Sequence, residues 1–290
     1  MEEQKKKKDD FRRFLRVFLG RGMLVKISLC IVFLFVFAAV FAPVITKYSP
    51  TEQDLLHRRA ALFSEGHFLG TDKFGRDIYT RLVYGARTSL TCSLLSSIWA
   101  SIVGSLLGII AGYFEGKIGR VIMGYIDAQL SIPALILSMT LATILGKNIF
   151  AIAIVIGIGS IPGYARVAYS NVLSIKENDY ILASDMIGQS KKNIILKHLF
   201  PNCMASLIVI FTMSLGQAIM VESSLAYLGV GLSEPMAAWG IMVADGFAYL
   251  TTHPSMALLP GFCIMLIVVA FNVIGDGLRD ALDPKLRGKL

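Results

Sequence analysis

The residues whose side chains could do chemistry are few in this sequence and lie far apart. Two acids, Asp127 and Glu222, lie at the ends of long apolar stretches, and an ionisable side chain within a membrane span usually faces a cavity or a partner. A structural role competes with that interpretation. Asp127 is close enough to the end of its stretch to extend toward water or to pair with Arg120 or Lys117, and Glu222 could cap a helix or form a pair near the opposite surface.

Neither acid belongs to a recognisable catalytic arrangement. No chain of acids and histidines runs through the apolar stretches, and the four histidines include no pair at i, i+4: His57, His67, His198 and His253. The run 112–118 resembles a phosphate-binding P-loop but lacks its first glycine and its magnesium-binding serine or threonine. The four cysteines include no C-x-x-C pair, so neither a zinc site nor a disulfide framework is indicated. We therefore expect no catalytic residue, no metal site and no cofactor held by this chain.

The elements that carry these residues are long apolar helices. The chain of 290 residues is 55% hydrophobic and only 17% charged, and its mean hydropathy is +0.65. A helix needs roughly 20 apolar residues to cross the hydrocarbon, and six blocks of about that length contain no Asp, Glu, Lys or Arg: 27–45, 88–114, 128–146, 148–165, 203–221 and 257–274. Because the blocks are apolar on every face, they predict helices rather than the strands of a membrane barrel. The sequence predicts an all-α membrane protein with six transmembrane helices.

The positions of the basic residues predict the orientation of these helices. Of the 28 Lys and Arg, 19 lie in residues 1–26, 116–120, 170–202 and the stretch after the sixth block. Basic segments that flank spans stay in the cytoplasm, so both termini are predicted there and a nucleic-acid partner is not. Residues 47–87 carry seven basic residues yet are predicted outside; long loops translocate largely regardless of charge. The chain divides into a basic tail (1–26), a first helix (27–45), an outer segment (46–87), a core of five helices (88–276) and a second tail (277–290).

One helix face in the second block is lined by small residues. They recur every four residues: Ser96, Ala100, Gly104, Gly108 and Gly112. Small residues at this spacing allow two helix backbones to approach closely in lipid. The face predicts either a static packing seam or a surface on which two helices slide during transport.

A polar segment, residues 170–202, interrupts the apolar blocks. The apolar residues of its first half fall on a helical period: Ile181, Leu182, Met186 and Ile187. Gly188 is predicted to end that helix. A second helical stretch is predicted at 191–200, with Pro201 ending it at the membrane. Short amphipathic helices of this kind suit docking into a groove on a partner and equally suit lying in the lipid interface, so the pattern alone leaves both roles open.

Five stretches, in this order along the chain, carry a closer resemblance. They are 67–77 (HFLGTDKFGRD) with 81–90 (RLVYGARTSL), 162–166 (PGYAR), the 170–202 segment, 224–231 (SLAYLGVG) with 239–240 (WG), and 270–284 (AFNVIGDGLRDALDP). In the third, Ala183, Gly188 and Pro201 have the spacing of the EAA loop of ABC-importer membrane subunits. Over nearly its whole length the chain resembles the C-type permease subunit of the dipeptide, oligopeptide and nickel importers. It departs from the family pattern at Leu182 and Ser184, where Glu and Ala are usual.

The resemblance implies a type I ABC-importer permease fold, with one N-terminal helix and a five-helix core, in the cytoplasmic (inner) membrane of a bacterium or archaeon. It also implies four kinds of partner: a second permease subunit of the B type, two cytoplasmic ATPases that bind ATP and magnesium, an external solute-binding protein, and the lipid bilayer. The chain itself is then a non-catalytic subunit. The 170–202 segment becomes the coupling segment, which transmits closure of the ATPases to the membrane helices and so drives alternating access.

The residues expected to act follow from these interpretations. Those expected to dock or couple the ATPase are Tyr180, Leu182, Ala183, Ser184, Asp185, Gly188, Lys191, His198, Pro201 and Asn202. Those expected to pack helices are Gly104, Gly108 and Gly112. Candidates for the pathway or a subunit interface are Asp127, Pro133, Arg166, Glu222, Asn272 and Asp276.

The cargo is predicted less directly, because selection in such importers lies largely in the binding protein. A short peptide is favoured, and nickel, a metal–chelator complex or a glutathione-like solute are the alternatives. A passive channel would need polar rings along a pore and no ATPase docking. A membrane-embedded enzyme would need acids or histidines that converge at depth.

Overall fold

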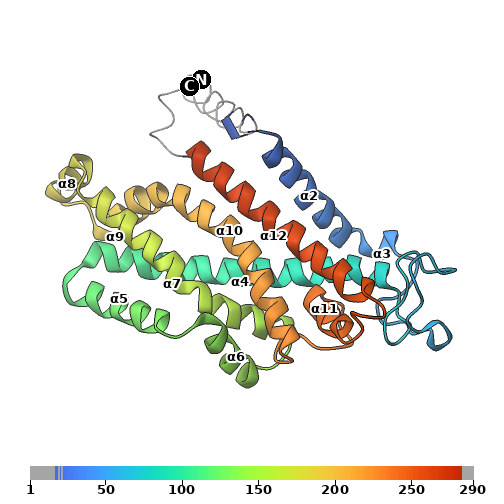
Figure 1. Ribbon diagram of the computed structural model, residues 1–290. Helices are drawn as coiled ribbons and strands as arrows, with labels where there is room; N and C mark the ends of the chain where they lie inside the picture. Colours follow the sequence, from blue (N-terminus) through green and yellow to red (C-terminus); the bar gives the residue numbers. More distant parts are fainter. Residues whose placement is uncertain (1–16, 19, 21, 283–290) are drawn as a thin grey trace.

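The computed structural model describes residues 17–18, 20 and 22–282 of the chain. Within these residues the regular structure is helical, apart from two isolated bridges at Ser64–His67 and Thr71–Asp77. The helices, drawn in Figure 1, are α2 (Met23–Val40), α3 (Ala42–Ile45), η1 (Leu55–His57), α4 (Ile78–Phe114), α5 (Gly116–Leu130), α6 (Ala134–Leu145), α7 (Ile149–Lys176), α8 (Asp179–Met186), α9 (Lys191–Ile194), η2 (Ile195–Leu199, a π-helical turn), α10 (Phe200–Tyr227), α11 (Trp239–Phe247) and α12 (Ser255–Leu282).

Five described helices are long and apolar enough to cross a membrane. They are α2, α4, α7, the continuous helix Lys191–Tyr227 formed by α9, η2 and α10, and α12. The sixth predicted span is the pair α5 and α6, which qualifies only when its two helices are taken together and is bent by 91° between them. The all-helical membrane fold predicted from the sequence is therefore confirmed, while its third span is a broken helix rather than a straight one.

The break in the third span lies at Pro133. The sequence predicted one helix over 128–146, but α5 begins at Gly116, ends at Leu130, and α6 starts again after Pro133. Proline disfavours a helical conformation in the residue before it, so the chain turns at 131–133. Asp127 consequently lies near the end of α5 and does not open a span.

Several helices extend well past their apolar blocks. α4 begins at Ile78, ten residues before the predicted start of the second span, and the Asp77 side chain caps it by accepting the Thr80 N–H at 2.8 Å. The early turns contain Arg81 and Arg87, which ended the apolar block without ending the helix. A helix forms wherever its backbone and caps allow, whereas an apolar block marks only the part of it that suits lipid.

Pro201 does not end a helix, contrary to the sequence prediction. It is the second residue of α10, and helix continues through it from Lys191 to Tyr227. A proline inside an α-helix lacks its N–H and clashes with the carbonyl four residues before it. Here the wider π-helical turn Ile195–Leu199 lies immediately before the proline, and such turns relieve the conflict.

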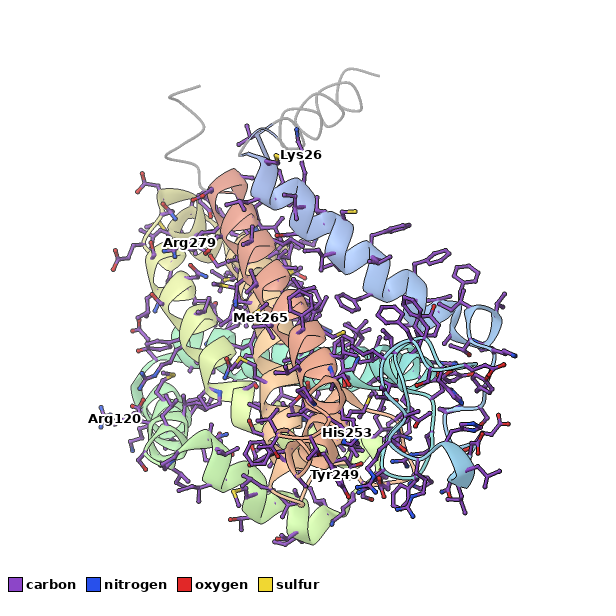
Figure 2. All side chains as sticks on the ribbon, turned by 45° about the vertical axis from the view of Figure 1, so that its right-hand side comes forward. Lys26, Arg120, Tyr249, His253, Met265 and Arg279 are labelled. Atoms are coloured by element: carbon purple, nitrogen blue, oxygen red, sulfur yellow. The ribbon has the colours of Figure 1, made fainter. Side chains whose placement is uncertain are left out.

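α4 is the central helix of the molecule and packs most extensively on α7. α10 lies against both, and α12 packs on α2, α10 and α11. Figure 1 shows α5 and α6 on the side of the molecule away from α2 and α12. Figure 2 shows Lys26 of α2 and Arg279 of α12 near one end of the molecule, with Tyr249 and His253 toward the other.

The small residues of α4 lie at its contact with α7. A Cβ built on Gly104 would lie 2.6 Å from the Ile161 carbonyl oxygen, and one on Gly112 would lie 2.8 Å from Val172 Cγ1. At Gly108 the added carbon would meet the Ala165 carbonyl oxygen at a still shorter distance. Any side chain here would push the two helices apart, so the absence of a Cβ allows their close approach.

Candidate functional site

The coupling segment forms a separate projection at one end of the molecule. α8 stands away from the membrane helices, at the end opposite the outer loops of residues 46–77 (Figure 1). It follows directly from α7 and is connected through 187–190 to the long helix that begins at Lys191. A Lys176–Glu115 ion pair of 3.0 Å joins the end of α7 to the start of α5, so these helix ends are at the same level.

Gly188 ends α8, as the sequence predicted. Its φ is +77°, a left-handed conformation that glycine adopts without strain. The Gln189 N–H donates to the Ser184 carbonyl at 3.1 Å, which is the 6→1 hydrogen bond of a Schellman cap. The next helix has a cap of its own, because the Ser190 side chain accepts the Asn193 N–H.

The apolar residues of α8 do not share one buried face, contrary to the period read from the sequence. Ile181 is only 3% exposed and belongs to a core cluster with residues of α4, α7 and α10. Leu182 is half exposed, and Met186 and Ile187 are 89% and 83% exposed. One apolar side chain therefore anchors the helix while three others face outward.

Several other residues predicted to dock or couple the ATPase contact neighbouring parts of the chain. Asn202 Nδ2 donates to the His198 carbonyl oxygen at 2.7 Å and to the Tyr180 hydroxyl at 3.3 Å, which ties α8 to the first turn of α10. The Ser184 hydroxyl donates to the Tyr180 carbonyl at 2.8 Å. Lys191 Nζ lies 5.7 Å from the centre of the Phe114 ring at the end of α4. Ala183 is exposed, and the side chain of Asp185 lies outside the described residues.

Asp127 pairs with Arg166. The partners suggested from the sequence, Arg120 and Lys117, were wrong. Arg166 Nη2 lies 2.7 Å from Asp127 Oδ1, which joins α5 to α7. The two side chains are 56% and 57% exposed. The sequence separated these residues by 39 positions, so only the packing of α5 beside α7 shows that they meet.

Glu222 is buried within the helices and does not pair near a surface. Its side chain is fully buried in α10, and Oε2 accepts the Ser89 hydroxyl of α4 at 3.3 Å. Ser89 Oγ in turn accepts the Trp239 backbone N–H at 3.3 Å. Glu222 Oε1 has no hydrogen-bond partner among the described residues. Glu222 thus belongs to the junction of α4, α10 and α11, where Trp239 is also fully buried.

The other candidates for the pathway lie apart from the Asp127–Arg166 pair. Pro133 precedes α6 at the break in the third span. Asn272 and Asp276 are exposed on α12, a helix that packs on α2, α10 and α11. The structure therefore does not bring all six candidates to one place.

An ionic cluster at the outer end joins the 46–77 loops to α11 and the loop before it. Arg76 lies 2.5 Å from Asp72 and 2.7 Å from Glu234, and Lys73 lies 2.8 Å from Asp245. Arg81 Nε lies 3.5 Å from Asp72. Three of the seven basic residues of segment 47–87, namely Lys73, Arg76 and Arg81, thus have acidic partners within the protein.

The cluster shifts the ionisation of its acids in opposite directions. Burial, together with the hydrogen bond it shares with Glu234, raises the pKa of Asp245 to about 6. Burial would raise the pKa of Glu234 as well, but hydrogen bonds with Asp245 and Arg76 outweigh burial and lower it to about 2. The stretch containing Asp72, Lys73 and Arg76 stands out in the sequence, whereas Asp245 carries no signal there because it lies 172 residues from its partner Lys73.

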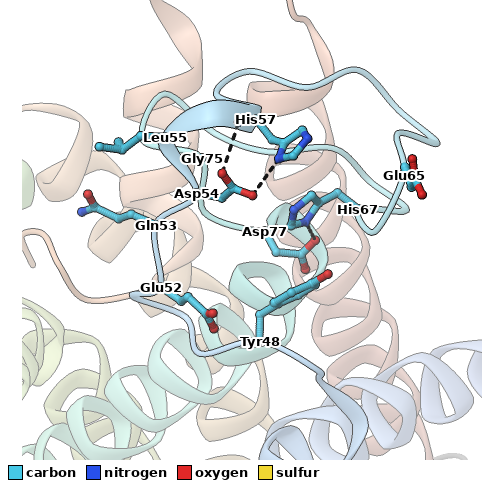
Figure 3. Close-up of a pocket in the computed structure, with 10 residues that line it drawn as sticks. All are labelled: Tyr48, Glu52, Gln53, Asp54, Leu55, His57, Glu65, His67, Gly75 and Asp77. Atoms are coloured by element: carbon cyan, nitrogen blue, oxygen red, sulfur yellow. Dashed lines mark hydrogen bonds and ion pairs between the residues drawn. The ribbon is translucent and has the colours of Figure 1, made fainter.

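The outer loops also enclose a hollow of about 600 Å³ lined by acids and histidines (Figure 3). His67 Nδ1 lies 2.9 Å from Asp77 Oδ1, and His57 Nδ1 lies 2.7 Å from Asp54 Oδ2. Accepting that hydrogen bond from His57 lowers the pKa of Asp54, although burial opposes it. No group of three or more His, Cys, Asp or Glu among the described residues is arranged to hold a metal ion. Two of the four carboxylates that line the hollow, Asp54 and Asp77, thus pair with histidines of the same loops.

Comparison with known proteins identifies the family. Residues 104–288 match the family model described as binding-protein-dependent transport system inner membrane component. Residues 11–62 match the N-terminal transmembrane domain of oligopeptide transport permease C. The two matches together cover the N-terminal helix, the coupling segment and most of the core.

Individual relatives resemble the chain over nearly its full length. The dipeptide transport system permease protein DppC of Alkalihalophilus pseudofirmus is 40% identical over 93% of this chain and 88% of its own. The oligopeptide transport system permease protein OppC of Bacillus subtilis is 36% identical over 91% of this chain and 86% of its own. The glutathione transport system permease protein GsiD of Escherichia coli is also 36% identical, over 96% and 91%.

A solved structure shares the fold at low sequence identity. A chain of the MetNI methionine ABC transporter in an inward-facing conformation superposes with a TM-score of 0.60 at 18% identity, covering 71% of this chain and 98% of that one. At that identity the likeness concerns the fold alone. The family match and the relatives of nearly full length show that the chain belongs to the binding-protein-dependent transport system inner membrane components, the multi-pass permease subunits of ABC importers.

Proposed function

We propose that this chain forms half of the translocation pathway of an ATP-driven importer of short peptides. A second permease subunit supplies the other half, two cytoplasmic ATPases supply the energy, and an external binding protein delivers the peptide. Membership of the family supports this set of partners. The names of the relatives support a short peptide as the cargo, because dipeptides, oligopeptides and glutathione are all peptides or peptide-like solutes.

The observation that carries the proposal is the geometry of α8. A short helix with Met186 and Ile187 exposed at its tip has an apolar surface that suits a groove on a partner protein. Ile181 at its base belongs to the core cluster that residues of α4, α7 and α10 also form, and α8 packs on α7 and α9. A partner that grips the tip can thus move the base, and through it the membrane helices.

The connections of α8 support a mechanism of alternating access. It lies between the end of α7 and the start of the long helix Lys191–Tyr227, so displacing it pulls on two membrane helices at once. Packed helix interfaces convert a small shift into a change between two discrete arrangements. In this mechanism, closure of the ATPases moves α8 and opens the space between the two permeases to the outside.

The proposal places α8 and both termini in the cytoplasm and the outer loops outside. The binding protein then faces the end of the molecule that carries the ionic cluster of Lys73, Arg76 and Asp245. The departures at Leu182 and Ser184 lie on α8 itself, and half-exposed Leu182 replaces a charged contact to the ATPase with an apolar one.

The experiment compares two surfaces of similar exposure. The variant Met186→Ser/Ile187→Ser removes the apolar tip of α8, and Leu56→Ser removes an equally exposed apolar side chain, 93% exposed, at the opposite end of the molecule. We expect the first variant to lose co-purification of the ATPases and peptide uptake into proteoliposomes, and Leu56→Ser to keep both. Retention of ATPase binding and uptake by the α8 variant would refute the coupling role.

The cargo is tested separately with the unaltered transporter. Uptake of a labelled dipeptide and a labelled tripeptide should depend on ATP and on the binding protein, and competition with glutathione should rank the two classes. Uptake that continues without ATP would indicate a passive channel. Uptake of nickel or a metal chelate in preference to peptides would overturn the peptide assignment while leaving the permease role intact.

A further inference from the structure

Two exposed rows of polar and small residues run along neighbouring helices in the membrane region. On α5 the row consists of Arg120, Gly124, Asp127 and Ser131, and on α7 it consists of Gly163, Arg166, Ser170 and Ser174. Their spacing of three and four residues places each row on one helix face. Ile118, Val121 and Tyr125 of α5 are exposed on a different face, and Leu130, also exposed, lies at the far edge of the row.

The Asp127–Arg166 ion pair joins the two rows immediately beside the apolar blocks 128–146 and 148–165. Asp127 is eleven residues from the first residue of α5, and Arg166 is ten residues from the last residue of α7. At roughly 1.5 Å per residue both lie about 15 Å along their helices. The Lys176–Glu115 pair puts those two helix ends at one level, so the two distances from that end agree.

A charged pair at the edge of the apolar blocks should face water rather than lipid. Each side chain is more than half exposed, and charged groups within a bilayer face a protein interior or a water-filled cavity. The residues beside it in both rows are glycine and serine, where a lipid-facing helix would carry large apolar side chains as α5 does at Val121. The two rows therefore form the wall of an aqueous space.

We propose that this wall lines the translocation pathway and that Asp127 and Arg166 form a binding site for the two charged ends of a peptide. This inference rests on the proposed function. A zwitterionic peptide carries an ammonium group that Asp127 can bind and a carboxylate that Arg166 can bind. Arginine holds a carboxylate with two parallel hydrogen bonds. The 2.7 Å pair closes the site when no peptide is present, and its exchange for the peptide's own charges leaves the pathway neutral throughout.

The first test measures whether the wall is wet. In the assembled transporter, Gly124→Cys and Ser170→Cys should react with a membrane-impermeant, water-soluble maleimide applied to open membranes. A Cβ on Gly124 meets no atom within 4 Å, so that variant should fold. Val121→Cys is the control, because Val121 is 73% exposed on the apolar face of the same helix, and it should react at least tenfold more slowly. The unsubstituted chain provides the blank for the four native cysteines.

The second test measures peptide binding at the pair. A free dipeptide should protect Gly124→Cys from the maleimide, and its N-acetylated and C-amidated forms should need about tenfold higher concentrations, as expected for the loss of one charge-assisted hydrogen bond. Adding Arg166→Gln should make the free and C-amidated peptides equivalent. Adding Asp127→Asn should make the free and N-acetylated peptides equivalent, and Arg166→Lys should restore part of the difference.

The outcomes separate this inference from its rivals. Absence of protection by the free dipeptide, or equal weakening of all three peptides by both charge variants, would overturn it. Unreactive Gly124→Cys and Ser170→Cys, with loss of the second permease from the charge variants, would show a subunit interface instead. If the unaltered transporter imports no peptide, the proposed function fails; if it imports peptide without protection, only this inference fails.

Discussion

Replacing Gly188 by alanine should loosen the end of α8 without disturbing anything else. The φ of +77° places this residue in the left-handed region, which costs a residue with a Cβ roughly 1–2 kcal/mol. A Cβ built there meets no atom within 4 Å, so no steric clash adds to that cost. The expected effect is therefore a destabilisation of the α8 cap by about 1–2 kcal/mol, or roughly a 5- to 30-fold increase in the population of its open form.

Amide hydrogen exchange on the assembled transporter in nanodiscs measures this population directly. The Gln189 N–H, which donates to the Ser184 carbonyl, and the amides of the last turn of α8 should exchange about 5 to 30 times faster in Gly188→Ala. Exchange in α7 and α12 should be unchanged, because opening of the cap is local. Peptide uptake should fall, since a frayed helix transmits less of the ATPase movement.

Two variants provide the comparison. Gly124→Ala places the same methyl group in open space on a helical glycine, and it should leave exchange in α8 at the wild-type rate. Gly188→Asn should fall between glycine and alanine, because asparagine tolerates the left-handed region better than alanine does. Wild-type exchange of the α8 amides in Gly188→Ala would refute the argument that the left-handed glycine determines where this helix ends.

The remaining predictions concern the helix seam and the outer ionic cluster. Gly108→Ala should destabilise the protein by roughly 1–3 kcal/mol in thermal unfolding, because the new carbon meets Ala168 Cβ at 2.7 Å. The control Gly261→Ala should unfold like the unaltered protein, because its new carbon meets nothing within 4 Å. Equal unfolding temperatures for the two variants would contradict the close approach of α4 and α7. The pKa of Asp245 is raised from 3.8 to about 6, so the folded chain binds the Asp245 proton more tightly than the unfolded chain does. The free energy of unfolding should therefore rise, by at most about 3 kcal/mol, as the pH falls from 7 to 4. The pKa of Glu234 is lowered to about 2, so its stabilisation is present above about pH 4.5 and lost as the pH falls toward 2. Asp245→Asn should abolish the gain between pH 7 and 4, and a gain that persists in this variant would assign the pH dependence to another group.

Local features of the fold were readable from the sequence. Six apolar blocks predicted the helical membrane fold, because the hydrocarbon demands long runs of apolar residues whatever their neighbours are. Gly188 predicted the end of α8 for a similar reason, since the left-handed conformation is a property of a single residue. Pro201 misled the prediction, because the effect of a proline depends on whether the preceding turn can widen, as it does at Ile195–Leu199.

Contacts between distant residues were decided only by the tertiary structure. The partner of Asp127 is Arg166 on another helix, Glu222 is buried against Ser89 instead of standing at a surface, and Lys73 finds Asp245 across 172 positions. The partner that a charged side chain meets depends on how its helix is rotated and where it crosses its neighbours, and hydropathy carries no information about either. Hydropathy and a single glycine were enough to predict the membrane helices and the end of α8. Only the packing of α5 beside α7 brings Asp127 and Arg166 together.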